Sequence, residues 1–283
     1  MRIKICGAVR TSDVELLAGM EVDLVGLRHG VAGGRGALRT VHPGRSELSA
    51  EAFLRLAAFA MATRRLRPVL VTAVDDVGWL RDVLTRSGVR WVQLHGHQGP
   101  GAVRALKTAL PPWEEPVTVV KVLRVRGGDC VERSLVPAYE RAGVDLFLID
   151  AESGNGHQGG QGHQGASEAV ARVADRLSRP FLLAGGASAR RDAEIAPIVR
   201  HPLFYGIDVD AETRVGNGRL HPDRLEAVHH AWRTHWVKEW MTPRRRTPSG
   251  RRGAYAPVAA SPVPLPYGAR VPFLPRGCAR PAV

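Results

Sequence analysis

Cysteine is scarce in this sequence. Its 283 residues include only three cysteines, Cys6, Cys130 and Cys278. Because this number is odd and the three positions lie far apart, the pattern excludes the disulfide framework of a small secreted domain. We therefore expect three free thiols.

Long hydrophobic runs are also missing. The fully apolar runs of this sequence are short, as the run at 146–149 illustrates, whereas a transmembrane helix needs roughly 18 apolar residues. The N-terminal segment MRIKICG contains no apolar stretch long enough for a secretory signal. The sequence thus predicts a cytoplasmic protein that does not contact a membrane.

Acidic residues are nearly absent from the C-terminal part of the chain. The whole sequence has 40 Lys+Arg against 27 Asp+Glu, a formal net charge of +13, and the stretch from Lys238 to the C-terminus carries +8 of it. A basic patch on a folded domain would favour a nucleic-acid partner, but this charge is concentrated in a tail. We therefore expect no specific nucleic-acid binding, only a nonspecific and salt-dependent attraction to that tail.

The tail at 242–283 is rich in proline and arginine and shows no apolar period of 2 or 3.6 residues. Proline fixes φ and removes a backbone hydrogen-bond donor, so we expect this segment to be disordered or extended. The predicted organisation is one folded domain at 1–241 and a basic Pro/Arg-rich tail at 242–283.

The predicted domain alternates between short apolar runs and segments with helical periodicity. Strands are predicted at 2–6, 23–27, 68–74, 90–95, 117–123, 144–150, 180–186 and 203–209. Helices are predicted at 12–20, 49–65, 76–87, 99–109, 130–142, 166–178, 189–198 and 221–240. Helix start signals include Ser49 and Asp76.

The predicted strands are apolar at nearly every position, as is typical of a sheet covered on both faces. Eight strand–helix units in residues 1–241 match the count and length of a (β/α)8 TIM barrel, an α/β fold. A doubly wound open sheet is the alternative.

In a TIM barrel, active sites lie at the carboxyl ends of the strands. The residues at these ends are Cys6-Gly7, Arg28-His29, Asp75-Asp76, Gln93–Gly96, Arg124–Arg126, Asp150, Gly185-Gly186 and Asp208–Asp210. They supply a thiol, carboxylates, basic groups and a glycine pair. The loops after the last two strands often hold a phosphate through backbone N–H groups.

Six short motifs near these strand ends carry a family resemblance. They are Ile3–Gly7 (IKICG), Gln93–Gly96 (QLHG), Leu148–Asp150 (LID), Gly159–Gly162 (GGQG), Leu183–Gly186 (LAGG) and Gly206–Val209 (GIDV). In order and spacing, over roughly residues 1–225, the set resembles the phosphoribosylanthranilate isomerase family. The resemblance implies an Amadori rearrangement in tryptophan biosynthesis, which converts an aldose-amine to a ketose-amine without a cofactor or metal.

The resemblance also implies roles for matched residues. Asp150 would protonate the ring oxygen and open the furanose, and Cys6 would remove the C2′ proton. Substrate contacts are implied for Arg39, Gln93, His95, Gly160, Gly185, Gly186 and Asp208. The expected ligand is a small phosphorylated amino sugar, and the expected oligomeric state is a monomer or homodimer.

Cys6 needs electrostatic help to act as a base. An ordinary thiol has a pKa near 8.5, and lowering it to about 7 requires roughly 2 kcal/mol from a nearby cation or dipole. From the alternation of side chains along a strand we expect Lys4 to point away from the neighbours of Cys6. Arg124 or Arg126 would then stabilise the thiolate.

The segment after the last predicted strand departs from the family pattern. Asp210 and Glu212 stand where the family has small residues beside the phosphate. At about 5 Å and an effective dielectric near 20, each carboxylate would repel a unit negative charge by about 3 kcal/mol. The His/Gln/Gly-rich segment 154–165 also differs from the family loop. Two alternatives therefore stay open: a paralogue acting on a different, non-phosphorylated substrate, and a non-catalytic barrel that binds a partner through its tail.

Overall fold

The computed structural model describes residues 1–31, 47–111, 115–151, 161–185, 195–216 and 218–233, of which 161–166 are described through their backbone only. The parallel strands in this part are β1 (Arg2–Cys6), β2 (Leu24–Arg28), β3 (Arg67–Thr72), β4 (Trp91–Leu94), β5 (Thr118–Arg126), β7 (Leu146–Ala151), β8 (Phe181–Gly185) and β9 (Phe204–Val209). The α-helices are α1 (Thr11–Gly19), α2 (Ala50–Ala62), α3 (Val77–Ser87), α4 (Pro100–Ala109), α5 (Val136–Ala142), α6 (Gln161–Ala174), α7 (Ala196–Val199) and α8 (Pro222–His230). The predicted tail at 242–283 lies outside the described residues, so the predicted division into domain and tail stays a prediction.

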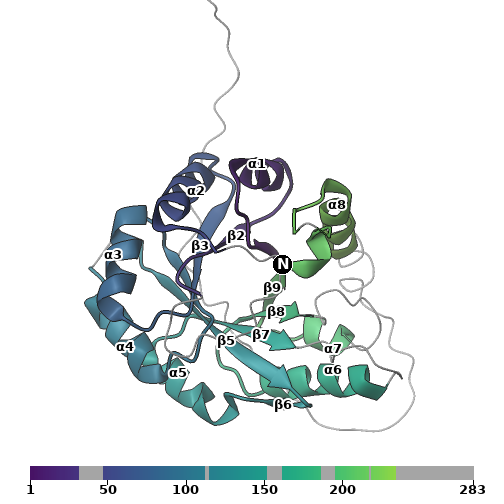
Figure 1. The fold of residues 1–283 in the computed structure, drawn as a ribbon. Coiled ribbons are helices and arrows are strands. Elements are labelled where there is room, and N and C mark those ends of the chain that lie inside the picture. The colour runs from purple at the N-terminus through teal and green to yellow at the C-terminus, as the bar shows by residue number, and fades with distance from the viewer. Residues whose placement is uncertain (32–46, 112–114, 152–160, 186–194, 217, 234–283) are drawn as a thin grey trace, which may run out of the picture. The chain divides into compact units, whose positions relative to one another are not determined.

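The strands close into a ring. Hydrogen-bonded neighbours follow the order β4-β3-β2-β1-β9-β8-β7-β5, and β4 also pairs with β5. At this closure Leu94 lies opposite Lys121, while β1 sits between β2 and β9 with Lys4 opposite both Leu24 and Asp208. Figure 1 shows the helices surrounding the strands. The predicted TIM barrel is confirmed, and the open sheet is wrong because the strands that would be its edges are paired.

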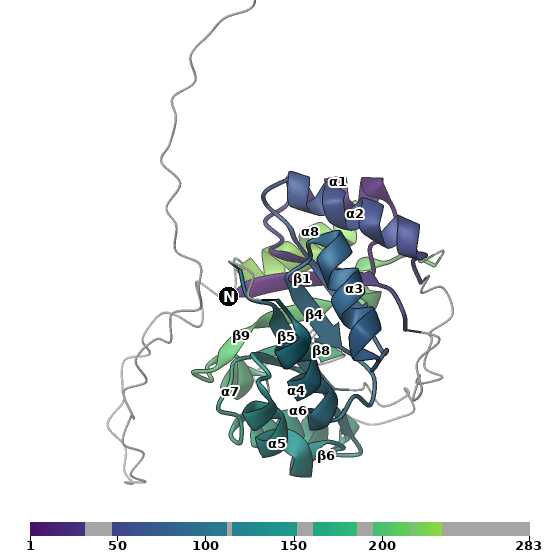
Figure 2. The same ribbon diagram turned by 90° about the vertical axis from the view of Figure 1, so that its left-hand side faces the viewer.

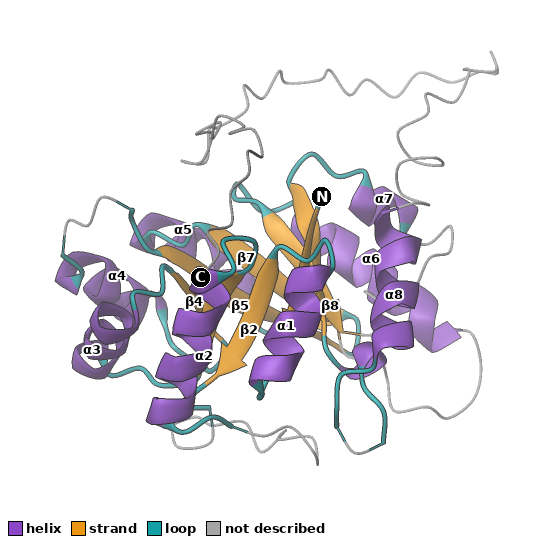
Figure 3. Ribbon diagram, turned by 90° about the horizontal axis from the view of Figure 1, so that it is seen from above, coloured by secondary structure: helices purple, strands orange, loops and turns teal. Residues whose placement is uncertain are grey.

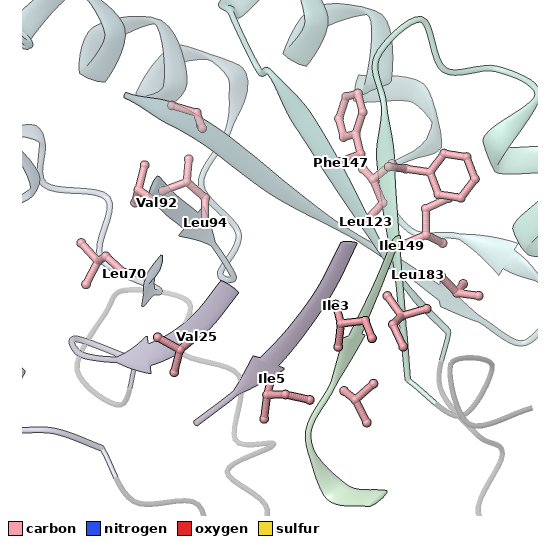
Figure 4. Packing of buried hydrophobic residues seen from close by; sticks show 14 of the residues in the cluster. Ile3, Ile5, Val25, Leu70, Val92, Leu94, Leu123, Phe147, Ile149 and Leu183 are labelled. Atoms are coloured by element: carbon pink, nitrogen blue, oxygen red, sulfur yellow. The ribbon is translucent and has the colours of Figure 1, made fainter. Parts of the chain in front are cut away.

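Side chains alternate between two apolar layers along each strand. The outer layer packs under the helices and includes Ile3, Ile5, Val25, Leu70, Val92, Leu94, Leu123, Phe147, Ile149 and Leu183 (Figure 4). The inner layer fills the barrel and includes Leu24, Val69, Val71, Trp91, Val120, Val122, Leu146, Leu148 and Leu182. Figures 2 and 3 show the helices covering the outside of the strands. Each fully buried side chain of this kind stabilises the fold by about 1.5–3 kcal/mol, which explains why the strands are apolar on both faces.

The fifth unit differs from its prediction. Strand β5 continues to Arg126, and a two-residue turn at Gly127 and Gly128 leads into the short antiparallel strand β6 (Asp129–Cys130). Both glycines have positive φ, 56° and 81°, which is the conformation that a tight hairpin turn requires. The segment predicted as one helix over 130–142 therefore contains β6, a 3₁₀ turn η1 (Arg133–Leu135) and only then α5.

The other predicted elements agree within a few residues where they are described. The start signals at Ser49 and Asp76 are confirmed, since their side chains accept hydrogen bonds from the backbone N–H groups of Ala52 and Trp79. Of the helix predicted at 189–198, residues 189–194 lie outside the described part, and α7 spans Ala196–Val199. Within the described residues, no helix is long and apolar enough to cross a membrane.

Candidate active site

Lys4 and Cys6 point into the barrel side by side. A Cβ atom added at Gly26 on the neighbouring strand would lie 2.8 Å from Cys6 Sγ and 3.1 Å from Lys4 Nζ. The prediction that Lys4 points away from Cys6 is therefore wrong: residues two apart on a strand share a face. Lys4 thus lies within electrostatic reach of the thiol.

Lys4 forms a buried ion pair with Asp208 across the β1–β9 junction. Lys4 Nζ donates to Asp208 Oδ2 at 2.8 Å, and the two side chains are only 1% and 7% exposed. Burial raises the pKa of Asp208 to about 6 against the opposing effect of Lys4, and the neighbouring charges of Asp210 and Asp150 add to this rise. Burial acts to lower the pKa of Lys4, but Asp208 and Cys6 outweigh it, so that the net shift is upward. The ammonium therefore stays charged at the centre of the site.

The thiol of Cys6 is buried, and this burial raises its pKa. Lys4 and Arg28 oppose the rise, while Asp208 and Asp210 add to it. The prediction that Arg124 or Arg126 is the main cation beside Cys6 is not supported, because Lys4 is the cation that acts most strongly on the thiol. The protonated thiol is therefore the favoured form of Cys6 at neutral pH.

The QLHG segment places two predicted substrate contacts at the end of β4. Gln93 is buried in the barrel, and the backbone N–H of His95 donates to Thr72 O at 2.8 Å. Burial, with the charges of Arg124 and Arg28, lowers the pKa of His95 to about 3, so its imidazole is neutral. Gln93 Oε1 and His95 Nδ1 are buried without a hydrogen-bond partner in the part of the chain that the structure describes.

Two cations on β5 hold this segment in place. Arg124 donates to His95 O and pairs with Glu132 Oε1 at 2.6 Å, with both side chains buried. Lys121 donates from Nζ to Gly96 O at 2.7 Å. Neither Glu132 nor Lys121 was expected at the site, although a lysine within the apolar run VTVVKVL is a signal for one.

Lys121→Met should remove a pH dependence of stability. Burial, reinforced by the charge of Arg124, lowers the pKa of Lys121 to about 7, whereas an unfolded chain keeps a value near 10.4. Between these two values the unfolded state binds more protons, so this lysine makes the free energy of unfolding increase with pH. Urea unfolding at pH 7, 8 and 9 should show wild type gaining about 2 kcal/mol more than the variant over this interval. Parallel pH curves for the two proteins would contradict the assignment.

Asp150 lies at the carboxyl end of β7, beside the predicted contact Gly185. A Cβ atom at Gly185 would overlap Ala151 O and lie 2.9 Å from Asp150 Oδ1. Gly185 also has a φ of +77°, which side chains disfavour. The close approach of β8 to the Asp150 carboxyl therefore requires glycine. The charge of Asp150 raises the pKa of Asp208. Asp150 therefore acts electrostatically on the buried Lys4–Asp208 ion pair, which in turn acts on Cys6.

Asp210 is not a free carboxylate beside a phosphate site. Its Oδ1 accepts a hydrogen bond from Arg214 Nε at 2.5 Å, and the same guanidinium donates to Cys6 O and Gly7 O at 2.7 and 2.6 Å. This ion pair offsets the repulsion expected from the Asp210 carboxylate. Glu212 lies in the 3₁₀ turn η2 (Ala211–Thr213) and is half-buried.

Some predicted contacts cannot be placed. Arg39, Gly160 and Gly186 lie outside the described residues, as does the part of the segment 154–165 that precedes α6. Within the described part, no group of three His, Cys, Asp or Glu side chains could hold a metal ion.

Comparisons with known proteins show the family to which this chain belongs. No protein-family model matches the chain. It is 31% identical over 231 residues to the N-(5′-phosphoribosyl)anthranilate isomerase of Pyrobaculum islandicum, covering 81% of this chain and 96% of that protein. It is 26% identical over 219 residues to N-(5′-phosphoribosyl)anthranilate isomerase 2 of Methanosarcina mazei, covering 77% and 88%. The solved phosphoribosylanthranilate isomerase of Thermotoga maritima superposes with a TM-score of 0.59 at 19% identity, covering 82% and 98%. The chain belongs to the phosphoribosylanthranilate isomerase family.

Proposed function

We propose that this protein is an active isomerase that converts N-(5′-phosphoribosyl)anthranilate to 1-(2-carboxyphenylamino)-1-deoxyribulose 5-phosphate. The observation that carries the proposal is the placement of Cys6 and Asp150 at the carboxyl ends of β1 and β7. The buried Lys4–Asp208 pair couples them, since Lys4 acts on the Cys6 thiol and Asp150 acts on Asp208. An acid and a base therefore lie around one charged centre.

The chemistry follows from these two groups. Asp150 gives its proton to the furanose ring oxygen, the C1′–O bond breaks, and the amine nitrogen supplies electrons to form a Schiff base. Cys6 then removes the proton from C2′, and the C–H electrons form the C1′=C2′ bond of an enolamine. Lys4 stabilises the thiolate during this step. Tautomerisation of the enolamine gives the ketone, so the reaction needs no external oxidant or reductant.

A phosphorylated ligand is compatible with the acidic turn after β9. Arg214 pairs with Asp210, which weakens the argument from that carboxylate for a non-phosphorylated substrate. A related structure is a phosphoribosylanthranilate isomerase in complex with reduced 1-(o-carboxyphenylamino)-1-deoxyribulose 5-phosphate, which supports the same ligand class here. Another related structure contains monomers generated from the dimeric phosphoribosylanthranilate isomerase of Thermotoga maritima, and monomer or homodimer stays the prediction for this chain. A cytoplasmic location and a role in tryptophan biosynthesis also stay predictions.

The test is turnover of freshly generated phosphoribosylanthranilate by the purified protein, followed by the loss of anthranilate-type fluorescence. We expect a kcat/KM of about 10⁴ M⁻¹s⁻¹ or more, and growth of an isomerase-deficient tryptophan auxotroph that carries the gene. Folded wild-type protein that neither turns over this substrate nor complements would contradict the proposal. That result would favour a paralogue with another substrate.

A further inference from the structure

Glu132 is a buried carboxylate that the short hairpin after β5 brings to the barrel. It lies two residues after β6 and is only 6% exposed. The hairpin turns the chain back along β5 (Figure 1), so that the backbone N–H of Val131 donates to Arg124 O at 2.9 Å. Glu132 Oε1 accepts a hydrogen bond from Arg124 Nη1 at 2.6 Å, and its Oε2 accepts one from the Arg124 backbone N–H at 2.8 Å. Both oxygens of this carboxylate are therefore bound by one residue, Arg124.

Arg124 stands beside Asp150, the acid of the proposed reaction. The register between β5 and β7 places these two residues opposite each other. Val122 and Leu148, two residues earlier on each strand, lie in the inner layer of the barrel, so Arg124 and Asp150 also point into the barrel. Neighbouring strands are about 4.8 Å apart. The Arg124 cation is therefore within electrostatic reach of the Asp150 carboxyl.

An uncompensated cation at this position would work against the proposed acid step. A positive charge about 4–6 Å from a carboxyl lowers its pKa by about 1–3. A general acid is most effective when its pKa lies near the working pH, because it must hold a proton before it can give one. Arg124 alone would therefore keep Asp150 ionised and unable to protonate the ring oxygen.

Glu132 opposes the charge of Arg124 at the groups around them. The two residues shift the pKa of each of these groups in opposite directions. The groups are Lys121, His97 and Tyr139. The buried ion pair thus acts on its surroundings as a dipole rather than as a full positive charge. Because Arg124 also donates to His95 O, the barrel keeps a cation that fixes the end of β4 without exposing the acid to its full charge.

The strands that flank β7 offer Asp150 no second buried cation on the inner face in the described part of the chain. On β8 the residue opposite Asp150 is the uncharged Ala184. On β5, Lys121 lies on the outer face, over the Tyr139 ring. Arg126 lies two residues beyond Arg124 and is exposed, so solvent screens its charge. The ionisation of Asp150 therefore depends strongly on whether Arg124 is paired.

The charges that face Asp150 from further away favour its protonated form. Asp208 on β9 carries a negative charge that pairs with Lys4 on β1. Asp150 and Asp208 repel each other, and this repulsion disfavours ionisation of both carboxyls. Helix α6 covers the outer face of β7 with apolar side chains. An unpaired Arg124 would oppose this arrangement.

We propose that Glu132 keeps Asp150 able to hold a proton at neutral pH by cancelling the charge of Arg124. Glu132 thereby acts through Asp150 as a positioning residue, and the β5–β6 hairpin serves to bring it there. The inference rests on the proposed function for the role of Asp150. It assigns a task to a hairpin that takes no part in closing the ring of strands.

The ionisation of Asp150 can be measured without turnover. Carbon-13 NMR of the aspartate carboxyl groups would follow it, with the Asp150 signal assigned from its loss in Asp150→Asn. Glu132→Gln should lower the pKa of Asp150 by at least about 1, because it leaves the charge of Arg124 uncompensated. Glu168→Gln removes an exposed carboxylate on α6 and should leave this pKa unchanged. A smaller fall in Glu132→Gln, or a rise, would overturn the proposal.

The double variant Arg124→Met/Glu132→Gln keeps the test decisive where the single variant does not fold. It removes both charges, so it leaves no unpaired ion of this pair in the barrel. The pKa of Asp150 in this variant should stay within about 0.5 of the wild-type value. A larger change in either direction would show that the pair is not neutral toward Asp150, and would overturn the proposal.

The pH dependence of single-turnover rates with phosphoribosylanthranilate separates this role from a structural one. The rate falls above the pKa of a general acid, so a lower pKa of Asp150 moves this alkaline limb to lower pH. In Glu132→Gln the limb should move by the amount that the NMR titration gives. A loss of rate that is equal at all pH values would identify Glu132 as a structural residue and contradict the proposal.

The two experiments also distinguish this inference from the proposed function. Wild type that does not turn over phosphoribosylanthranilate would contradict the proposed function alone. An Asp150 pKa that does not depend on Glu132 would contradict this inference alone.

Discussion

Cys6→Ala should lower kcat for phosphoribosylanthranilate by about 100- to 10,000-fold, which is the range for loss of a general acid or base. The alanine cannot remove the C2′ proton, while the contacts that hold the ligand remain, so KM should change by less than about 3-fold. Asp150→Asn should have a comparable effect on kcat, because the amide keeps the shape of the side chain but cannot donate a proton to the ring oxygen. Fluorescence-based steady-state kinetics would measure both variants.

Matched controls separate catalysis from folding. Cys130→Ala removes the other described buried cysteine, which packs in the outer apolar layer, and should keep wild-type kcat. Asp82→Asn removes an exposed carboxylate on α3 and should also be silent. Wild-type kcat in Cys6→Ala or Asp150→Asn would contradict the assigned roles, whereas a loss of kcat in Cys130→Ala equal to that in Cys6→Ala would show that the effect is structural.

Lys4→Met should destabilise the protein by about 3–5 kcal/mol, because it leaves the buried carboxylate of Asp208 without its partner. The loss should grow with pH. In the folded variant Asp208 escapes its unpaired charge by binding a proton, while in the unfolded chain its pKa stays near 3.9. Above that value the unfolded state binds fewer protons than the folded state, so the free energy of unfolding falls as pH rises. Urea unfolding at pH 5 and pH 8 should therefore show the larger loss at pH 8.

The double variant Lys4→Met/Asp208→Asn tests whether the pair itself is the cause. With both charges gone, no unpaired ion remains in the barrel, and the double variant should recover at least 2 kcal/mol, or about half of the loss in Lys4→Met. If the double variant loses as much stability as Lys4→Met and Asp208→Asn lose in sum, the two charges are not coupled, and the ion pair is not the cause of the loss. A loss of stability in Lys4→Met that is equal at pH 5 and pH 8 would contradict the claim that Asp208 becomes an unpaired buried carboxylate in this variant.

The barrel and the placement of Cys6 and Asp150 could be predicted from the sequence. Apolar strands that alternate with amphipathic helices have few ways to bury both faces of every strand, and a closed parallel barrel is one of them. Residues at the ends of parallel strands then share one rim, whatever the details of packing. Side-chain alternation also places Lys4 beside Cys6, because residues two apart on a strand lie on the same face. The expectation that Lys4 points away from Cys6 is inconsistent with this rule.

Only the tertiary structure decided which charges are paired. Lys4 and Asp208 are 204 residues apart, and Arg214 reaches Cys6 O across 208 residues. Such partners depend on the register between β1 and β9 where the ring closes, and a local pattern contains no information on that register. The pairing of Asp210 with Arg214, by contrast, is local, because the two residues are four apart in the chain. The sequence therefore determined at which strand ends the reactive groups stand, and the tertiary structure decided which distant groups pair with them.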